Sequence, residues 1–134
     1  MTLSVADRLD ILDVVTRADA AASSRDAEAY LACFTDDARL VGAMGEYSGK
    51  DELRRSVGPI WAAEGESTVH LCMNPLVDGT ADGRAEVRSI LLIVAAGPPA
   101  VPVGVSAITQ QLVKTGDGWR VEVRAVSDVT SGPR

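Results

Sequence analysis

Residues 103–129 read VGVSAITQQLVKTGDGWRVEVRAVSDV, which is typical of two long β-strands, Val103 to Lys114 and Trp119 to Val129, joined by the turn residues TGDG. In the second strand apolar and charged residues alternate, so its two faces differ in character. The apolar face holds Trp119, Val121, Val123 and Ala125, and the charged face holds Arg120, Glu122 and Arg124. We expect the apolar face to pack against helices, and Arg124 to lie on the surface or in an interface.

Two more strands precede this hairpin. Patterns with a period of two extend over Ser67 to Val77 and Arg84 to Ala96. The segment Asp78 to Gly83 is predicted to be the hairpin loop between them, and Gly97 to Pro102 a longer, proline-rich connection. Consecutive long strands on short turns predict an antiparallel meander.

The N-terminal part of the chain shows helical spacing instead. A helix is predicted from Val5 to Ala22, with Ser4 as its N-cap and Asp7 as a short variant of the capping-box acid. A second, short helix is predicted from Ala27 to Phe34, capped by Asp26.

A third helix is predicted from Lys50, with Ser48 as its cap and a kink or interruption at Gly58-Pro59. Before it come a turn at Asp36-Asp37, a strand at Ala38 to Ala43 and an extended piece at Gly45 to Gly49. Helices first and strands afterwards predict an α+β fold, with the helices on one face of the sheet.

Composition narrows the class of protein. The 134 residues carry a net charge of −6 with arginines interleaved among acids, which disfavours nucleic-acid binding. The longest apolar run, Ile90 to Ala96, is too short to span a bilayer, and no signal peptide is evident, so a cytoplasmic location is the default expectation.

We expect one domain over residues 1–134. Cys33 and Cys72 are expected to be buried free thiols, and no zinc-binding pattern is present.

Five groups of residues, in order along nearly the whole chain, carry a resemblance to a known family. They are Ile11 to Asp26, Phe34 to Ala38, Gly45 to Gly49, His70 to Asn74 and Gly116 to Arg120. Their order and spacing resemble the SnoaL-like domain of the NTF2-like superfamily, in its scytalone dehydratase-like and dehydrochlorinase-like branch. The resemblance implies a cone: a curved antiparallel or mixed sheet, with three N-terminal helices on its concave face and a pocket between them. It also implies a homodimer made through the outer sheet face.

The resemblance places His70, the only histidine, where such relatives keep a catalytic base. A base with a pKa near neutral suits proton abstraction beside a leaving group or a carbonyl. The alternative is a partly buried histidine satisfied by a backbone carbonyl. The aspartate that orients the base in those relatives is replaced by Ser23. Asp19, one helical turn earlier, could substitute, although a solvated acid at the helix edge is the favoured interpretation.

Further residues are candidates for binding a substrate. Asn74 is expected to share a strand face with His70 and Cys72 and to bind a substrate oxygen, or else to hold the turn before Pro75. Tyr47 and Trp61 are candidate pocket walls, or simply core residues. Small residues stand at Ala18, Ala22 and Gly42, and at Ala18 and Gly42 the resemblance implies a polar side chain in many relatives. They predict a wide, apolar cavity for a bulky hydrophobic ligand.

The leading hypothesis is an enzyme that needs neither cofactor nor metal and does acid–base chemistry on a hydrophobic small molecule. It would be a dehydratase, isomerase or cyclase, with His70 as the base, Asp19 or Ser23 as its partner and Asn74 at a substrate oxygen. Two alternatives stay open, because this fold also carries proteins without enzymatic activity. One is a non-catalytic module that holds an apolar ligand, and the other is a protein–protein module that uses the sheet face.

Overall fold

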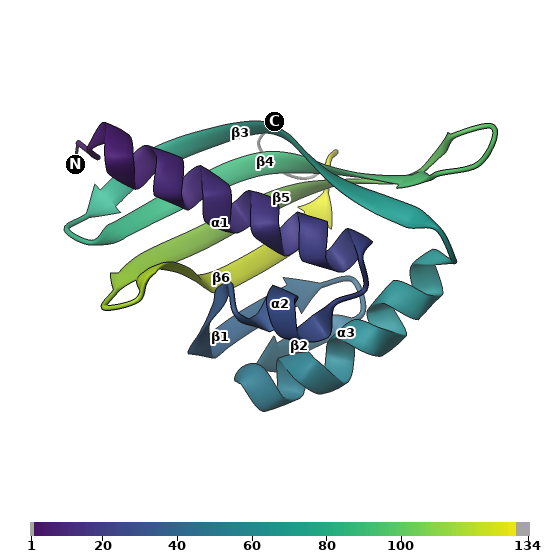
Figure 1. Ribbon diagram of the computed structural model, residues 1–134, viewed down its shortest axis with the longest axis horizontal. Helices are drawn as coiled ribbons and strands as arrows, with labels where there is room; N and C mark the ends of the chain where they lie inside the picture. Colours follow the sequence, from purple (N-terminus) through teal and green to yellow (C-terminus); the bar gives the residue numbers. More distant parts are fainter. Residues whose placement is uncertain (1, 131–134) are drawn as a thin grey trace.

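The computed structural model describes residues 2–130. Its first helix, α1 (Val5–Ser23), lies diagonally across the sheet (Figure 1). The predicted cap is confirmed, because Ser4 Oγ accepts a hydrogen bond from the Asp7 amide at 3.0 Å. The buried face of α1 includes Ile11, Val15, Ala18 and Ala22. These residues belong to the same hydrophobic core as the buried residues of the sheet.

The second helix is shorter than predicted. It spans Ala27–Leu31 (α2) and is capped by Asp26, as expected. The prediction that it reaches Phe34 was wrong, because Phe34 begins strand β1 (Phe34–Gly42) and pairs in parallel with Val121. The predicted turn at Asp36-Asp37 was also wrong, since both residues lie within β1. They lie in an irregular stretch of β1, between the paired residues Phe34 and Arg39.

Strand β2 (Gly45–Ser48) pairs with β1 and leads into α3 (Lys50–Glu64). The predicted interruption of this helix is absent: α3 runs through Gly58-Pro59. Both residues are exposed, so water can bind the carbonyl that the proline leaves without a donor. Ser48 is not the cap. Gly49 holds that position with a φ of 84°, which a side chain would strain.

The remaining strands are β3 (Thr68–Ala81), β4 (Arg84–Ala95), β5 (Val101–Thr115) and β6 (Gly118–Asp128). They form the predicted antiparallel meander within a six-stranded sheet of order β2-β1-β6-β5-β4-β3, in which only β1 and β6 run parallel. The α+β prediction is confirmed, with the helices packed on one face of a curved mixed sheet (Figure 1).

The loop between β3 and β4 is shorter than predicted. Asp78 and Gly79 were assigned to a loop, yet they pair with Glu86 and Ala85. Only the two residues between Ala81 and Arg84 make the turn. Cross-strand hydrogen bonds thus extend β3 through residues that favour turns in isolation.

A β-bulge in β6 reverses which side chains face the core. Gln111 pairs with Val123 but Leu112 pairs with Val121, so Glu122 is an extra residue in the ladder. The alternation shifts by one position, and Arg124 becomes 97% buried, leaving 3% exposed. The prediction that Arg124 lies on the surface or in an interface was therefore wrong.

Hydrogen bonds to Asp7 connect the first turn of α1 to strands β5 and β6. Its carboxylate accepts hydrogen bonds from Trp119 Nε1 and Lys114 Nζ, each at 2.9 Å, and from Ser4 Oγ at 2.9 Å. The hydrogen bond from Lys114 makes the largest contribution, followed by those from Trp119 and Ser4, and together they lower the pKa of Asp7 to about 2.

Among the described residues, no helix is long and apolar enough to cross a membrane.

The Asp7 contacts predict a specific dependence of stability on pH. The pKa of Asp7 is depressed on folding, so its contribution is fully present above about pH 4 and is lost as pH falls towards 2. We expect Asp7→Asn to be less stable than wild type at pH 7, with the difference shrinking as the pH approaches 2. Urea unfolding followed by circular dichroism would measure it. Asp10→Asn, an exposed position on the same helix, is the control. A difference that persists unchanged at pH 2 would contradict the assignment.

Candidate functional site

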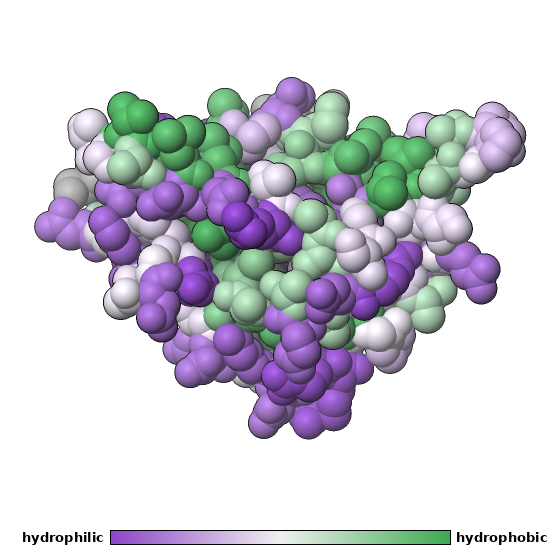
Figure 2. Space-filling model, viewed as in Figure 1, coloured by the Kyte–Doolittle hydropathy of each residue, from purple (hydrophilic) through white to green (hydrophobic). Residues whose placement is uncertain are grey.

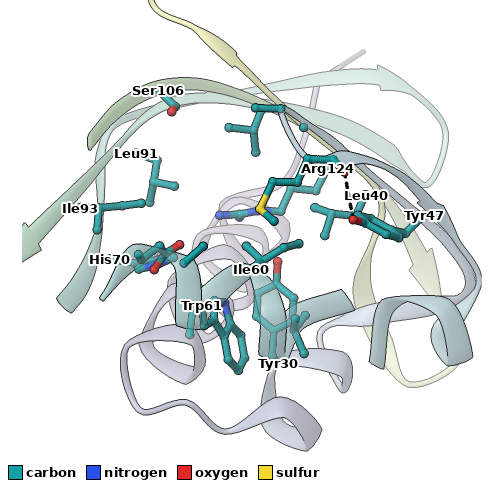
Figure 3. Close-up of a pocket in the computed structure, with 18 of the residues that line it drawn as sticks. Tyr30, Leu40, Tyr47, Ile60, Trp61, His70, Leu91, Ile93, Ser106 and Arg124 are labelled. Atoms are coloured by element: carbon teal, nitrogen blue, oxygen red, sulfur yellow. Dashed lines mark hydrogen bonds and ion pairs between the residues drawn. The ribbon is translucent and has the colours of Figure 1, made fainter. Parts of the chain in front are cut away.

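A cavity of about 370 Å³ lies between the helices and the sheet (Figure 3). Its wall is mostly apolar, with Leu40, Ile60, Leu91, Ile93 and Val126 among the lining residues. The lining comes from the end of α1, from α2 and α3, from the β1–β2 hairpin and from strands β3 to β6. A cavity of this size and character suits a hydrophobic small molecule.

At one part of this wall an imidazole meets a carboxylate. His70 Nε2, on β3, lies 2.6 Å from Oε1 of Glu64, the last residue of α3. The chain reverses between them through Gly65 and Ser67, both with positive φ. Both side chains line the cavity and both are largely buried, with 5% of the His70 side chain and 16% of the Glu64 side chain exposed. This is the kind of pair that transfers protons in enzymes.

The guanidinium of Arg25 forms an ion pair with the carboxylate of Glu64. Its Nη1 lies 3.6 Å from Glu64 Oε1, and its guanidinium stands over the Trp61 ring at 5.9 Å. It also donates hydrogen bonds to the carbonyls of Ala22 and Gly65 and to Thr68 Oγ1. Arg25 therefore joins the end of α1 to the α3–β3 reversal and places a permanent positive charge beside Glu64.

The hydrogen bonds of His70 indicate one ring tautomer. Nδ1 is buried and has no hydrogen-bond partner among the described residues. A buried N–H without an acceptor is costly, so the proton is expected on Nε2, where it is donated to Glu64. Ser23 does not bind the ring. Its Oγ accepts the backbone N–H of His70 at 2.8 Å and donates to the Asp19 carbonyl at 3.0 Å, which ties β3 to α1.

Asp19 belongs to a second polar cluster. It is 4% exposed, so the favoured interpretation as a solvated acid was wrong. Its Oδ1 accepts a hydrogen bond from Arg124 Nη2 at 3.0 Å, and Arg124 Nη1 donates to Gln110 Oε1 at 3.2 Å. The carboxylate that the sequence suggested as a partner for His70 is thus bound by Arg124, which itself lines the cavity. Gln110 Nε2 has no partner among the described residues.

The other sequence-predicted residues divide into two groups. The cavity lining includes Ala22, Gly42, Tyr47 and Trp61. Ala18 is instead fully buried in the core, and Cys72 is half-buried away from the lining. Asn74 is exposed, with a φ of 54°, at a register shift between Met73 and Leu76. The structure thus places Asn74 in a bend of β3 rather than beside His70.

The lining residues that were not assigned to the site from the sequence include Tyr30, Glu64 and Arg124. The position of Glu64 could have suggested its role, because it lies six residues before His70 across a glycine that allows the chain to reverse. The inward orientation of Arg124 depends on the bulge in β6, which the alternation of this strand does not indicate.

Both cysteines are free, as predicted, but only Cys33 is buried, whereas Cys72 is half-buried. Burial raises the pKa of each thiol. Among residues 2–130, no group of three or more His, Cys, Asp or Glu side chains is arranged to hold a metal ion.

The buried Asp19–Arg124 pair generates a prediction about stability. Asp19→Leu leaves the Arg124 guanidinium buried without a counter-charge, which should lower the free energy of unfolding by about 3 to 5 kcal/mol. The double variant Asp19→Leu/Arg124→Met removes both charges and should be more stable than Asp19→Leu alone. Urea denaturation of the three proteins would measure both differences. A single variant as stable as wild type would show that the pair is not required for folding.

Comparisons with known proteins agree with this architecture. A crystal structure of a protein of unknown function with a cystatin-like fold from Nostoc punctiforme is 26% identical, with a TM-score of 0.88 over 99% of this chain and 98% of that chain. A candidate aromatic ring hydroxylase from Novosphingobium aromaticivorans is 22% identical, with a TM-score of 0.81 over 96% and 92%. A candidate dehydratase of the NTF2-like family from Streptomyces avermitilis is 20% identical, with a TM-score of 0.80 over 94% and 99%.

None of the curated proteins matches the chain. The sequence model of the SnoaL-like domain, however, matches residues 3–125, which include α1, every cavity-lining residue except Val126, and most of β6. The protein is therefore a member of the SnoaL-like domain family, with the NTF2-like fold.

Proposed function

We propose that this protein is a cofactor-independent acid–base enzyme of the dehydratase, isomerase or cyclase type, acting on a hydrophobic small molecule in the cavity. The observation that carries the proposal is the 2.6 Å contact between His70 Nε2 and Glu64 Oε1 in the cavity wall. Glu64 takes the role that the sequence assigned to Asp19 or Ser23. It holds the imidazole and stabilises the positive charge that develops on it.

Because Nε2–H is donated to Glu64, the free lone pair of His70 Nδ1 accepts a proton from a carbon of the substrate, and Glu64 stabilises the imidazolium that forms. The electron pair of the broken C–H bond then moves towards a neighbouring carbonyl oxygen. In an isomerase the pair returns the proton to another carbon, and in a cyclase the new nucleophilic carbon attacks a second carbonyl group. In a dehydratase the electrons expel a hydroxyl group, which leaves as water with the proton that the pair returns.

The apolar wall contributes by excluding water from the reacting atoms. An ion pair or a developing charge interacts more strongly in such surroundings than in bulk solvent. Arg25 balances the charge of Glu64, so the carboxylate can remain in this largely buried position.

Exchange of carbon-bound hydrogen tests the proposal without knowledge of the physiological substrate. The probe is 2-tetralone, a hydrophobic bicyclic ketone with acidic hydrogens beside its carbonyl. In D₂O we expect the wild-type protein to accelerate exchange of these hydrogens, followed by proton NMR. His70→Gln and Glu64→Gln should each lower the acceleration by about 100-fold, the usual loss when an acid–base group is removed.

Glu66→Gln is the matched control for Glu64→Gln, because Glu66 is exposed and only two residues away; it should exchange like wild type. If His70→Gln and Glu64→Gln, shown by circular dichroism to be folded, also match wild type, the pair is not the base. Binding of 2-tetralone with no acceleration by the wild-type protein would instead favour the non-catalytic binding module.

We further propose that the protein forms a homodimer through the outer face of its sheet. Leu71, Leu92 and Val105 lie side by side on adjacent strands of that face, and Met73 pairs with Ile90 in the next row. Leu71, Met73 and Val105 are each more than 40% exposed. Figure 2 views the opposite side, which α1 covers, and shows hydrophobic residues at both ends of the upper edge and mainly hydrophilic ones along the bottom. An apolar row of this kind suits burial against a second copy.

The dimer proposal predicts the effect of a charge at the centre of this face. Leu92→Glu should convert a dimer to a monomer, because a carboxylate would be buried without a partner in the interface. Light scattering coupled to size-exclusion chromatography would measure the mass. Thr80→Glu, which adds the same charge at an exposed position near the end of β3, should leave the dimer intact. A monomeric wild-type protein would exclude the proposal.

A further inference from the structure

Apart from His70 and Glu64, two polar side chains of the cavity lining are deeply buried, and they come from different elements. Tyr30 stands on α2 and Arg124 on β6. Figure 3 shows the Tyr30 hydroxyl directed into the cavity and the Arg124 side chain reaching into it from the sheet. Both residues are more than nine-tenths buried, with 4% and 3% exposed. Polar groups this deep require a hydrogen-bond partner, or a ligand that supplies one.

The fold already orients both groups without using all their donors. The Tyr30 ring packs on Phe34 at 4.9 Å and on Trp61 at 5.4 Å, and its hydroxyl makes no hydrogen bond to any described residue. Arg124 donates one hydrogen bond to Asp19 and one to Gln110. A guanidinium carries five N–H groups, so further donors remain. Burial raises the pKa of the Tyr30 hydroxyl, which keeps it protonated and able to donate at neutral pH.

The charges around the cavity are balanced in pairs. Asp19 neutralises Arg124, and Arg25 stands beside Glu64. A ligand carboxylate would therefore lose its hydration and find no unpaired cation, with two protein carboxylates nearby. A carbonyl oxygen needs only hydrogen-bond donors. Those donors interact more strongly as negative charge develops on that oxygen during proton abstraction.

We propose that Tyr30 and Arg124 form a subsite for a carbonyl oxygen, and that the ligand is an uncharged, largely hydrophobic ring system that presents such an oxygen. Leu91, Ile93 and Val126 of the cavity wall contact its apolar body. This inference rests on the cavity of the proposed function, but on residues other than the acid–base pair. It names the substrate class: neutral ketones, enones or quinones rather than acids.

Three ligands of one shape test the subsite by equilibrium binding: 2-tetralone, tetralin, which lacks the oxygen, and 1,2,3,4-tetrahydro-2-naphthoate, which carries a carboxylate. Dissociation constants come from NMR titration of the labelled protein. Wild type should bind the ketone more tightly than the carboxylate. Tyr30→Phe keeps the ring and removes the hydroxyl, so it should weaken ketone binding by about fivefold and leave tetralin binding unchanged.

Ser56→Ala is the control for loss of a buried hydroxyl, because Ser56 lies outside the cavity lining and its hydroxyl donates to the Leu53 carbonyl at 2.8 Å. It should bind all three ligands like wild type. Unchanged ketone affinity in Tyr30→Phe would overturn the subsite, as would a carboxylate that binds wild type at least as tightly as the ketone does. The wild-type comparison needs no variant, so it stands even if Tyr30→Phe is unstable.

Binding and hydrogen exchange separate this inference from the proposed function. His70→Gln should lose exchange while it keeps the affinity for 2-tetralone. If the wild-type protein does not accelerate exchange but shows the predicted ligand preference and the Tyr30→Phe effect, the subsite is supported and the catalytic proposal fails. Exchange without any ligand preference overturns the subsite and supports the acid–base pair.

Discussion

The extra residue at Glu122 is the constraint on which the interior of this protein depends. It turns Arg124 from the outer face of the sheet towards the helices. A guanidinium buried in that position requires a carboxylate, and α1 supplies Asp19 from 105 residues away. The same pair fixes how α1 lies against β6. One irregularity in a strand thus determines the polarity of the core, the placement of a helix and the character of the cavity wall.

The second polar feature of the cavity, the contact between His70 and Glu64, depends on the end of α3. Glu64 is the last helical residue, and the reversal through Gly65 returns the chain along β3 so that His70 faces it. Arg25 holds this reversal in place by bonding to Gly65 and Thr68. In this chain the acid beside the histidine comes from the third helix, while Ser23 of the first helix serves the backbone of β3. The imidazole of His70 therefore has a carboxylate partner, although Ser23 stands where the resemblance implies an aspartate.

The sequence predicts the regular elements well, because a strand or helix buried on one face carries its period in the sequence. The long strands, the cap at Ser4 and the α+β order follow from such patterns. The errors arise where distant pairing decides. Asp78 favours a turn locally but pairs with Glu86 in the β3–β4 ladder. The bulge leaves no mark in the alternation of residues 119–125, so the orientation of Arg124, and with it the burial of Asp19, could not be predicted. The position of His70 in the cavity wall follows from family resemblance, whereas its contact with Glu64 depends on how α3 docks.

The bend at Asn74 has a consequence for how molecules of this protein meet one another. Strand β3 forms one edge of the sheet, and such an edge offers unpaired backbone groups to any other extended chain. Here the positive φ of Asn74 interrupts the regular pairing between Met73 and Leu76, and Pro75 has no N–H to offer. The edge is broken near its middle, so it is a poor template for adding further strands. An exposed apolar sheet is thereby kept from growing into a continuous, aggregating β-structure.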